Sequence, residues 1–248
     1  MKQAINTYLQ KNGFEALRLK AVFFDMDGVL FESMPNHAKT WAIVAREYGL
    51  DLSPEEVYMN EGRTGESTIN MLTQRQWGRA ATAREVEEIY ARKCALFNQC
   101  EEAPPMPGAA EVLRCVKQAG LGIYVVTGSG QLSLLNRLQT NYPGYFSPDR
   151  LISSRDVRHG KPHPEPYLMA LDRAGLQPWE ALVVENAPLG VRSAVAARIF
   201  TIAVNTGPLQ PQTLTNEGAH LVFPSMNALA EQWEELLAAL EAQYSCSQ

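Results

Sequence analysis

Cysteine is scarce in this sequence and is not arranged for metal binding. The 248 residues include four cysteines, which are Cys94, Cys100, Cys115 and Cys246. None belongs to a CxxC pair, and none stands at ligand spacing from a histidine, so a structural zinc site is not expected. We interpret the four as reduced thiols of a cytoplasmic protein.

Long apolar runs and basic stretches are missing as well. No run approaches the ~18 apolar residues of a membrane-spanning helix, and residues 1–20 contain no apolar stretch of signal-peptide length. Lysine and arginine together number 22 against 27 aspartates and glutamates, which gives a formal net charge of −5 without a basic stripe. We therefore expect no membrane partner and no nucleic-acid partner. An anionic substrate would have to be attracted by local positive charge or by a metal.

The overall composition is that of an ordinary globular protein. Hydrophobic residues make up 46% of the chain and charged residues 20%. This length and composition suffice for one large domain, or for a main domain with a smaller insert, without disulfides. We expect a monomer in the cytoplasm.

Short apolar runs alternate with helical patterns over most of the chain. Runs of strand length occur at 21–24, 121–126, 151–152, 182–184 and 200–204. Helical patterns separate the later runs, and Gly175 ends one of them. Strands that alternate with helices form parallel sheets, so we predict an α/β fold with a doubly wound, Rossmann-like parallel sheet covered by helices on both faces.

Residues 34–103 interrupt this alternation because their pattern is helical throughout. Helical patterns are predicted at 40–49, 54–58, 66–74 and 82–99. We therefore predict a small all-α domain, residues 34–103, inserted after the first strand into an α/β core domain formed by residues 1–33 and 104–248. A closing amphipathic helix is expected over 227–241.

The segment from Phe24 to Leu30 places two carboxylates at the end of the first apolar run. Asp25 and Asp27 project to the same side of an extended chain. They would lie where a parallel strand opens into a loop, which is the edge at which open α/β sheets bind ligands. Such a pair suits a shared cation, or a nucleophile beside an acid/base. An Asp-rich turn closed by Gly28 explains the same residues equally well.

The second apolar run also ends in a polar motif. The residues Thr127, Gly128 and Ser129 follow it directly. A hydroxyl followed by small residues at a strand-to-helix turn lets backbone N–H groups face an anion such as phosphate. A helix N-cap turn is the simpler account of this motif taken alone.

Two later loops carry a lysine and a pair of oxygen donors. Lys161 lies in the proline-rich segment 160–167, where a fixed ammonium could balance carboxylates and a phosphoryl group, although a solvated surface lysine is the simpler reading. Glu185 and Asn186 end another strand and offer the hard oxygens that magnesium takes, although a helix cap explains them too.

Taken together, the motifs resemble those of a known enzyme family. Asp25/Asp27, Thr127, Lys161 and Glu185/Asn186 fall in order at four predicted strand ends and resemble the four motifs of the haloacid dehalogenase superfamily. The resemblance covers nearly the whole chain. The helical insert is similar to the α-helical cap of the β-phosphoglucomutase-like branch, and Ser33 and His37 match positions of that branch.

The resemblance implies a reaction through an aspartyl-phosphate. Asp25 would be the nucleophile, and Asp27 would be the general acid and then the base. Magnesium would be held by the Asp25 carboxylate, the Asp27 backbone carbonyl and the pair Glu185/Asn186. Thr127 and Lys161 would complete the catalytic set.

Substrate contacts are implied on both sides of the site. The residues expected to bind substrate are Ser33, His37, Arg63, Lys93, Gly128 and Ser129. The cap would act as a lid, hinged near residues 30–34 and 103–106, that excludes water. The chain departs from the branch at two positions: Asn186 replaces an aspartate, and Gly65 stands where mutases carry an arginine. Arg63, Lys93 or Arg92 could compensate for the missing arginine, although a solvated helix face accounts better for Arg92.

These features predict a magnesium-dependent phosphatase that acts on a small phosphorylated metabolite, a sugar or polyol phosphate. A β-phosphoglucomutase-type mutase is the alternative, and a non-catalytic sugar-phosphate binder is a third. Dehalogenases lack an acid two residues after the nucleophile, so Asp27 argues against them. A phosphonatase would need an imine-forming lysine in the cap, for which Lys39 or Lys93 could be proposed, but the cap does not otherwise resemble that branch.

Overall fold

A six-stranded parallel sheet forms the centre of the protein. The computed structural model describes residues 1–130 and 134–242. The strands are β1 (Ala21–Phe24), β2 (Gly122–Val126), β3 (Leu151–Ile152), β4 (Ala181–Glu185), β5 (Phe200–Val204) and β6 (Leu221–Phe223). Their order is β3-β2-β1-β4-β5-β6, and every neighbouring pair is parallel. The predicted doubly wound α/β fold is confirmed.

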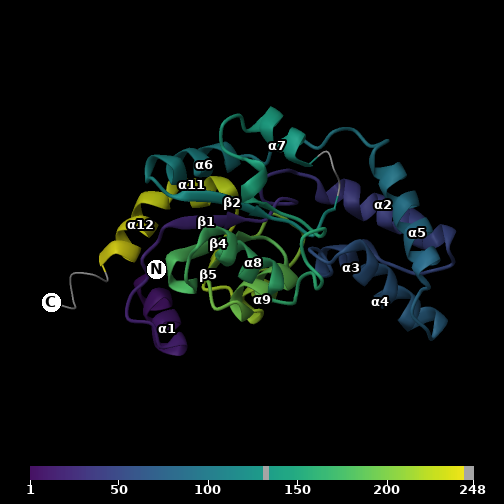
Figure 1. Ribbon diagram of the computed structural model, residues 1–248, viewed down its shortest axis with the longest axis horizontal. Helices are drawn as coiled ribbons and strands as arrows, with labels where there is room; N and C mark the ends of the chain where they lie inside the picture. Colours follow the sequence, from purple (N-terminus) through teal and green to yellow (C-terminus); the bar gives the residue numbers. More distant parts are fainter. Residues whose placement is uncertain (131–133, 243–248) are drawn as a thin grey trace.

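Helices cover both faces of this sheet (Figure 1). One face packs against α1 (Lys2–Asn12), α6 (Ala109–Gln118), α7 (Leu134–Asn141), α11 (Met226–Glu231) and α12 (Trp233–Glu241). The other face packs against α8 (Glu165–Ala174) and α9 (Pro188–Ala196), while α10 (Pro211–Asn216) lies beside α9 and β6. Side chains alternate across a strand, so Val22 and Phe24 of β1 enter one core and Phe23 enters the other. This two-sided burial explains why β1 is a continuous apolar run.

A cap of helices is inserted between β1 and β2. It consists of α2 (Met34–Glu47), α3 (Pro54–Met59), α4 (Gly65–Trp77) and α5 (Ala83–Phe97). The cap has its own apolar cluster, which includes Trp41, Val44, Ile69, Leu72 and Ile89. In Figure 1 the four cap helices lie together on the right, to one side of the sheet. The predicted all-α cap after the first strand is confirmed.

The chain segments that enter and leave the cap run side by side. Phe31 and Pro105 form an antiparallel bridge. The Glu32 N–H donates to the carbonyl of Pro104 at 3.0 Å, and the Met106 N–H donates to the carbonyl of Leu30 at 2.9 Å. The two linkers are therefore held together as a short paired strip.

Several elements differ from the sequence predictions. β6, α7 and α10 were not predicted, and the strand expected over 121–126 begins at Gly122. The single helix expected over 227–241 is two helices, because α11 ends at Glu231 and α12 begins at Trp233. Cys94, Cys100 and Cys115 are free and partly exposed, whereas Cys246 lies outside the described residues. None of the helices in residues 1–130 and 134–242 has both the length and the apolar character of a membrane span.

Candidate active site

The motif residues meet where the strand order reverses. β1 and β4 are neighbours in the sheet but not in the sequence, and this kind of switch point opens a crevice at the carboxyl ends of the strands. Asp25 follows β1 directly, and Asn186 follows β4. A pocket lies there between core and cap. Its lining includes Asp25, Asp27, Gly128 and Ser129 from the core, and His37, Arg63 and Lys93 from the cap.

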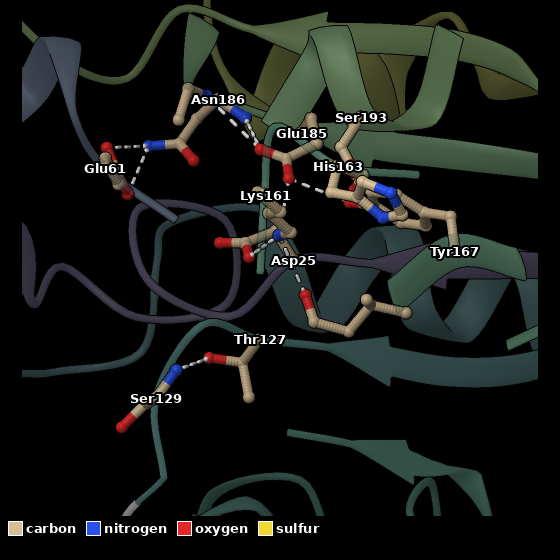
Figure 2. A network of polar contacts seen from close by, with 12 residues as sticks. Asp25, Glu61, Thr127, Ser129, Lys161, His163, Tyr167, Glu185, Asn186 and Ser193 are labelled. Carbon is tan, nitrogen blue, oxygen red and sulfur yellow. Dashed lines mark hydrogen bonds and ion pairs between the residues drawn. The ribbon is translucent and has the colours of Figure 1, made fainter. Parts of the chain in front are cut away.

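Lys161 is the centre of a buried network on the core side (Figure 2). Its side chain is 1% exposed, and its ammonium donates to Asp25 Oδ1 at 2.5 Å, to Glu185 Oε1 at 2.6 Å and to the carbonyl of Val126 at 2.9 Å. The Tyr167 hydroxyl also donates to Glu185 Oε1, at 2.8 Å. The three oxygens that accept from Lys161, on Asp25, Glu185 and Val126, use all three N–H donors of its ammonium. The reading of Lys161 as a solvated surface lysine is wrong.

The surroundings of Asp25 raise its pKa to about 8. Burial is the main cause, and it outweighs the ammonium of Lys161, which lowers the pKa, while Glu185 and Asp27 raise it further. Burial works against the charge of Lys161, but Asp25 and Glu185 together raise the pKa of that lysine. The lysine is therefore charged. Asp25 needs a further positive charge, in addition to that of Lys161, to ionise fully at neutral pH.

Asp27 has the opposite electrostatic setting. The Ser33 hydroxyl donates to Asp27 Oδ1 at 2.5 Å, and His37 Nε2 lies 3.3 Å from the same oxygen. Burial opposes ionisation of Asp27, but His37 and Ser33 lower its pKa well below the usual range. The Nζ of Lys93 lies 2.9 Å from His37 Nδ1. Burial and Lys93 lower the pKa of His37, so a neutral imidazole that accepts from Lys93 and donates to Asp27 satisfies both contacts.

Gly28 closes the loop that carries the two aspartates. It has a φ of +80°, which side-chain-bearing residues rarely adopt, and its N–H donates to the carbonyl of Phe31 at 2.8 Å. A Cβ at this position would lie 2.0 Å from Nδ2 of Asn186. The Asp-rich turn expected as the simple account is present, and its glycine leaves the space that Asn186 occupies.

The loop after β2 meets the cap. Thr127 is buried, and its hydroxyl oxygen accepts from the Ser129 N–H at 3.1 Å. Gly128 lies so close to the cap that a Cβ there would be 2.5 Å from the carbonyl oxygen of Gly62. Gly128 and Ser129 line the pocket as expected, whereas the helix N-cap reading concerns residues 131–133, which lie outside the described residues.

The cap cations differ in position. Arg63 lines the pocket, and its guanidinium donates to Asn60 Oδ1 at 3.0 Å and to Ser67 Oγ at 3.1 Å. Lys93 is buried in the same pocket. Arg92 forms an exposed ion pair with Glu47 at 2.7 Å, as its solvated-face reading requires.

The space beside Gly65 is already filled. A Cβ at this position would lie 2.2 Å from the ring of Tyr90, which comes from α5 and also lines the pocket. This contact explains why residue 65 has no side chain. An arginine here would require Tyr90 to move.

Two site residues carried no functional signal in the sequence. Tyr167 anchors Glu185 from α8, and a tyrosine in an amphipathic helix is ordinarily a core residue. Glu61 lies in the cap loop before α4, yet it is only 9% exposed and accepts from Nδ2 of Asn186 (Figure 2). Burial, and then the nearby Asp25, raise the pKa of Glu61 well above its usual value. Neither contact is visible in a local motif.

The donor set fits a hard divalent cation. The Oδ1 of Asn186 is buried and has no hydrogen-bond partner among the described residues. Around it lie the carboxylates of Asp25, Asp27, Glu61 and Glu185, several of which repel one another. An unpartnered amide oxygen beside crowded carboxylates is the kind of site that magnesium occupies.

Comparisons with known proteins agree with this geometry. The family model of haloacid dehalogenase-like hydrolases matches residues 19–198. Hexitol phosphatase A of Escherichia coli K12 is 34% identical over 76% of this chain and 84% of its own length. Fructose-1-phosphate phosphatase YqaB of the same organism is 29% identical over 75% of this chain and 97% of its own length.

A solved structure is similar over almost the full length. It is a "putative beta-phosphoglucomutase" from Bacteroides vulgatus, 55% identical, with a TM-score of 0.94 over 97% of this chain and 98% of that one. The fold, the motif order and these matches lead to one conclusion. The chain belongs to the haloacid dehalogenase-like hydrolases, and its helical cap places it with the β-phosphoglucomutase-like members.

Proposed function

We propose that the protein is a magnesium-dependent phosphatase of a small phosphorylated sugar or polyol. The observation that carries the proposal is the buried contact between Asp25 and Lys161 at the floor of a pocket closed by the cap. The similarity to a hexitol phosphatase and a fructose-1-phosphate phosphatase supports the substrate class.

Asp25 is the nucleophile in this proposal. Its carboxylate attacks phosphorus, so that an aspartyl-phosphate forms while the bond from phosphorus to the substrate oxygen breaks. Lys161 holds Asp25 at 2.5 Å and stabilises negative charge on the transferring phosphoryl group. Gly128 and Ser129, which line the pocket beside Asp25, bind the phosphoryl oxygens, and Thr127 fixes their loop.

Asp27 is the acid/base partner. It gives its proton to the leaving oxygen in the first step and takes a proton from water in the second, so that water can attack the aspartyl-phosphate. The contacts from Ser33 and His37 keep Asp27 ionised in the arrangement described here. This arrangement therefore suits the second step, in which Asp27 acts as the base.

Magnesium would be held by oxygens of Asp25, Asp27 and Asn186. Both oxygens of Glu185 accept protein donors, from Lys161 and Tyr167 on one side and from the backbone of Asn186 on the other. Glu185 would thus contribute its charge and orient the neighbouring ligand. Bound magnesium would offset the repulsion between carboxylates and phosphate.

A phosphate-release assay tests the proposal. The purified chain is incubated with a panel of sugar and polyol phosphates, and with a generic aryl phosphate, with magnesium or with EDTA. We expect phosphate release from members of the panel, which EDTA abolishes. No turnover of any phosphate would contradict both enzyme assignments and leave the non-catalytic sugar-phosphate binder.

A mutase remains the second candidate because of the 55% identity to the Bacteroides vulgatus structure. In a mutase, the same aspartyl-phosphate would give its phosphoryl group to a sugar hydroxyl. Gly65 and the ring of Tyr90 disfavour this assignment, since they leave no room for an arginine that would hold a second phosphate. Incubation with β-glucose 1-phosphate and a bisphosphate primer discriminates the two: a mutase yields glucose 6-phosphate, and a phosphatase yields inorganic phosphate.

A further inference from the structure

Glu61 connects the cap to the core at the proposed metal site. It lies in the loop between α3 and α4, and both of its carboxylate oxygens accept from Nδ2 of Asn186, at 3.1 and 3.2 Å. Figure 2 shows this contact at one end of the network that includes Lys161 and Asp25. The two residues are 125 positions apart in the sequence.

This contact determines which way the Asn186 amide faces. A carboxamide has a donor end and an acceptor end, and in this contact both oxygens of Glu61 accept from the donor end. With its nitrogen against Glu61, Asn186 must direct Oδ1 elsewhere, and that buried oxygen has no partner among the described residues. A buried acceptor without a partner is unfavourable, so this oxygen is available to a ligand. Oxygen donation to a cation would satisfy it.

The contact requires the cap loop to be seated on the core. Gly62, which follows Glu61, has a φ of +85°, and a Cβ there would lie 2.9 Å from Cδ of Lys161. A Cβ at Gly128 would in turn lie 2.5 Å from the carbonyl oxygen of Gly62. The loop therefore reaches Asn186 only when the cap is closed over the site.

The residue types at positions 61 and 186 match each other. An aspartate at 186 would place a carboxylate about 3 Å from the carboxylate of Glu61, and like charges at that distance repel strongly. An asparagine removes the repulsion and gains a donor. The departure from the family pattern at Asn186 thus has a partner in the cap.

We propose that Glu61 is a positioning residue that fixes the Asn186 amide for magnesium through a contact made only by the closed cap. The inference rests on the metal site of the proposed function. It follows that magnesium binding favours cap closure and that cap closure strengthens magnesium binding, since each stabilises the same orientation of Asn186.

Titration calorimetry of magnesium on the full chain tests whether Glu61 strengthens magnesium binding. Glu61→Gln has nearly the same shape but can present either end of its amide, so we expect magnesium affinity to fall about tenfold, equivalent to ~1.4 kcal/mol. Glu66→Gln is the matched control, because Glu66 is exposed at the start of α4, the helix that follows the loop of Glu61. Magnesium is the appropriate probe because His159, His163 and Glu165 form a separate cluster that could take transition metals.

Hydrogen exchange of the cap loop 60–65 tests whether magnesium binding favours cap closure. In the unaltered chain we expect magnesium to slow exchange there, and we expect Glu61→Gln to lose most of that effect. Asn186→Asp should speed exchange, because it places two carboxylates together. Combining it with Glu61→Gln should restore slow exchange, because the amide and the carboxylate have then exchanged places.

The outcomes separate this inference from the proposed function. Unchanged magnesium affinity and unchanged exchange in Glu61→Gln would overturn the inference, whatever the phosphatase activity. Absence of rescue in the double variant would also overturn it, since a contact that only fills space would not respond to the exchange of charge. Magnesium-dependent loop protection without turnover of any phosphate would support the inference and contradict the phosphatase.

Discussion

Asp25 and Asp27 are two residues apart, yet they lie in contrasting surroundings. Asp25 contacts Lys161, which also contacts Glu185, and all three residues belong to the core. Asp27 contacts Ser33 at the hinge and His37 in the cap, which in turn contacts Lys93. Burial raises the pKa of Asp25 to about 8, whereas the donors around Asp27 lower its pKa.

The two carboxylates depend on different parts of the protein for their contacts. The side chain of Asp25 is held by Lys161, a core residue. The ionisation of Asp27 depends in part on His37, which belongs to the cap. Two titratable groups whose pKa values are pushed apart by their environments are the usual basis of separate catalytic roles. In this chain the separation follows the boundary between core and cap.

Replacing Asp25 should have the largest effect. Asp25→Asn is expected to lower kcat for phosphate release by about 10⁴-fold or more, because it removes the proposed nucleophile. The measurement is phosphate release with magnesium. Asp172→Asn, at an exposed position of α8, should leave kcat unchanged. Substantial activity in Asp25→Asn would remove Asp25 from the proposed role.

Removing the ammonium should affect stability as well as activity. Lys161→Met leaves Asp25 buried without its cation, and breaking a buried pair in this way costs about 3 kcal/mol. Urea unfolding in EDTA at pH 9 measures the loss, with the exposed Lys39→Met as the control. The loss should be smaller at pH 6, below the pKa of about 8, where Asp25 is protonated with or without Lys161. If the loss of unfolding free energy did not change with pH, it would come from packing and not from charge.

The hinge contact to Asp27 should have a smaller effect. Ser33→Ala removes the hydroxyl that donates to Asp27 Oδ1, and we expect kcat/KM to fall about tenfold, as for a hydrogen bond to a charged group. Ser33→Thr keeps a hydroxyl and should retain most of the activity. Equal losses in the two variants would indicate a packing effect rather than a hydrogen bond.

The pH dependence of stability gives the smallest predicted effect. The pKa of Asp25 is higher in the folded chain than its usual value of 3.8, so the folded state retains this proton more strongly than the unfolded state. In EDTA the free energy of unfolding should therefore fall as pH rises from 7 to 9, by about 1 kcal/mol. Thermal or urea unfolding measures this, and magnesium or Asp25→Asn should flatten the slope. A flat profile in EDTA would show that Asp25 ionises normally.

The sequence predicted those parts of the fold and site that depend on local pattern. The run Ala21–Phe24 is apolar because both faces of β1 are buried, and the motif residues follow such runs directly. The parallel sheet then brings the strand ends together. The cap was predicted from helical periodicity between 34 and 103. In contrast, β6 was not predicted; it lies at the edge of the sheet, and of its three residues only Phe223 is buried.

What the sequence did not reveal are contacts between distant segments. Glu61 belongs to the site because it accepts from Asn186, and Tyr167 belongs to it because its hydroxyl donates to Glu185. The different contacts of Asp25 and Asp27 likewise involve Lys161 and His37, which are not sequence neighbours of either aspartate. The break between α11 and α12 at Gln232 has no proline or glycine to announce it.

The paired linkers at Phe31 and Pro105 make the core nearly continuous in space across the inserted helices. The chain leaves the core and returns to it at adjacent points, so the core need not distort to accommodate whatever lies between them. Inserting or exchanging material there costs little loop-closure entropy. The cap can therefore change in length or sequence without a change in the course of the sheet beneath it.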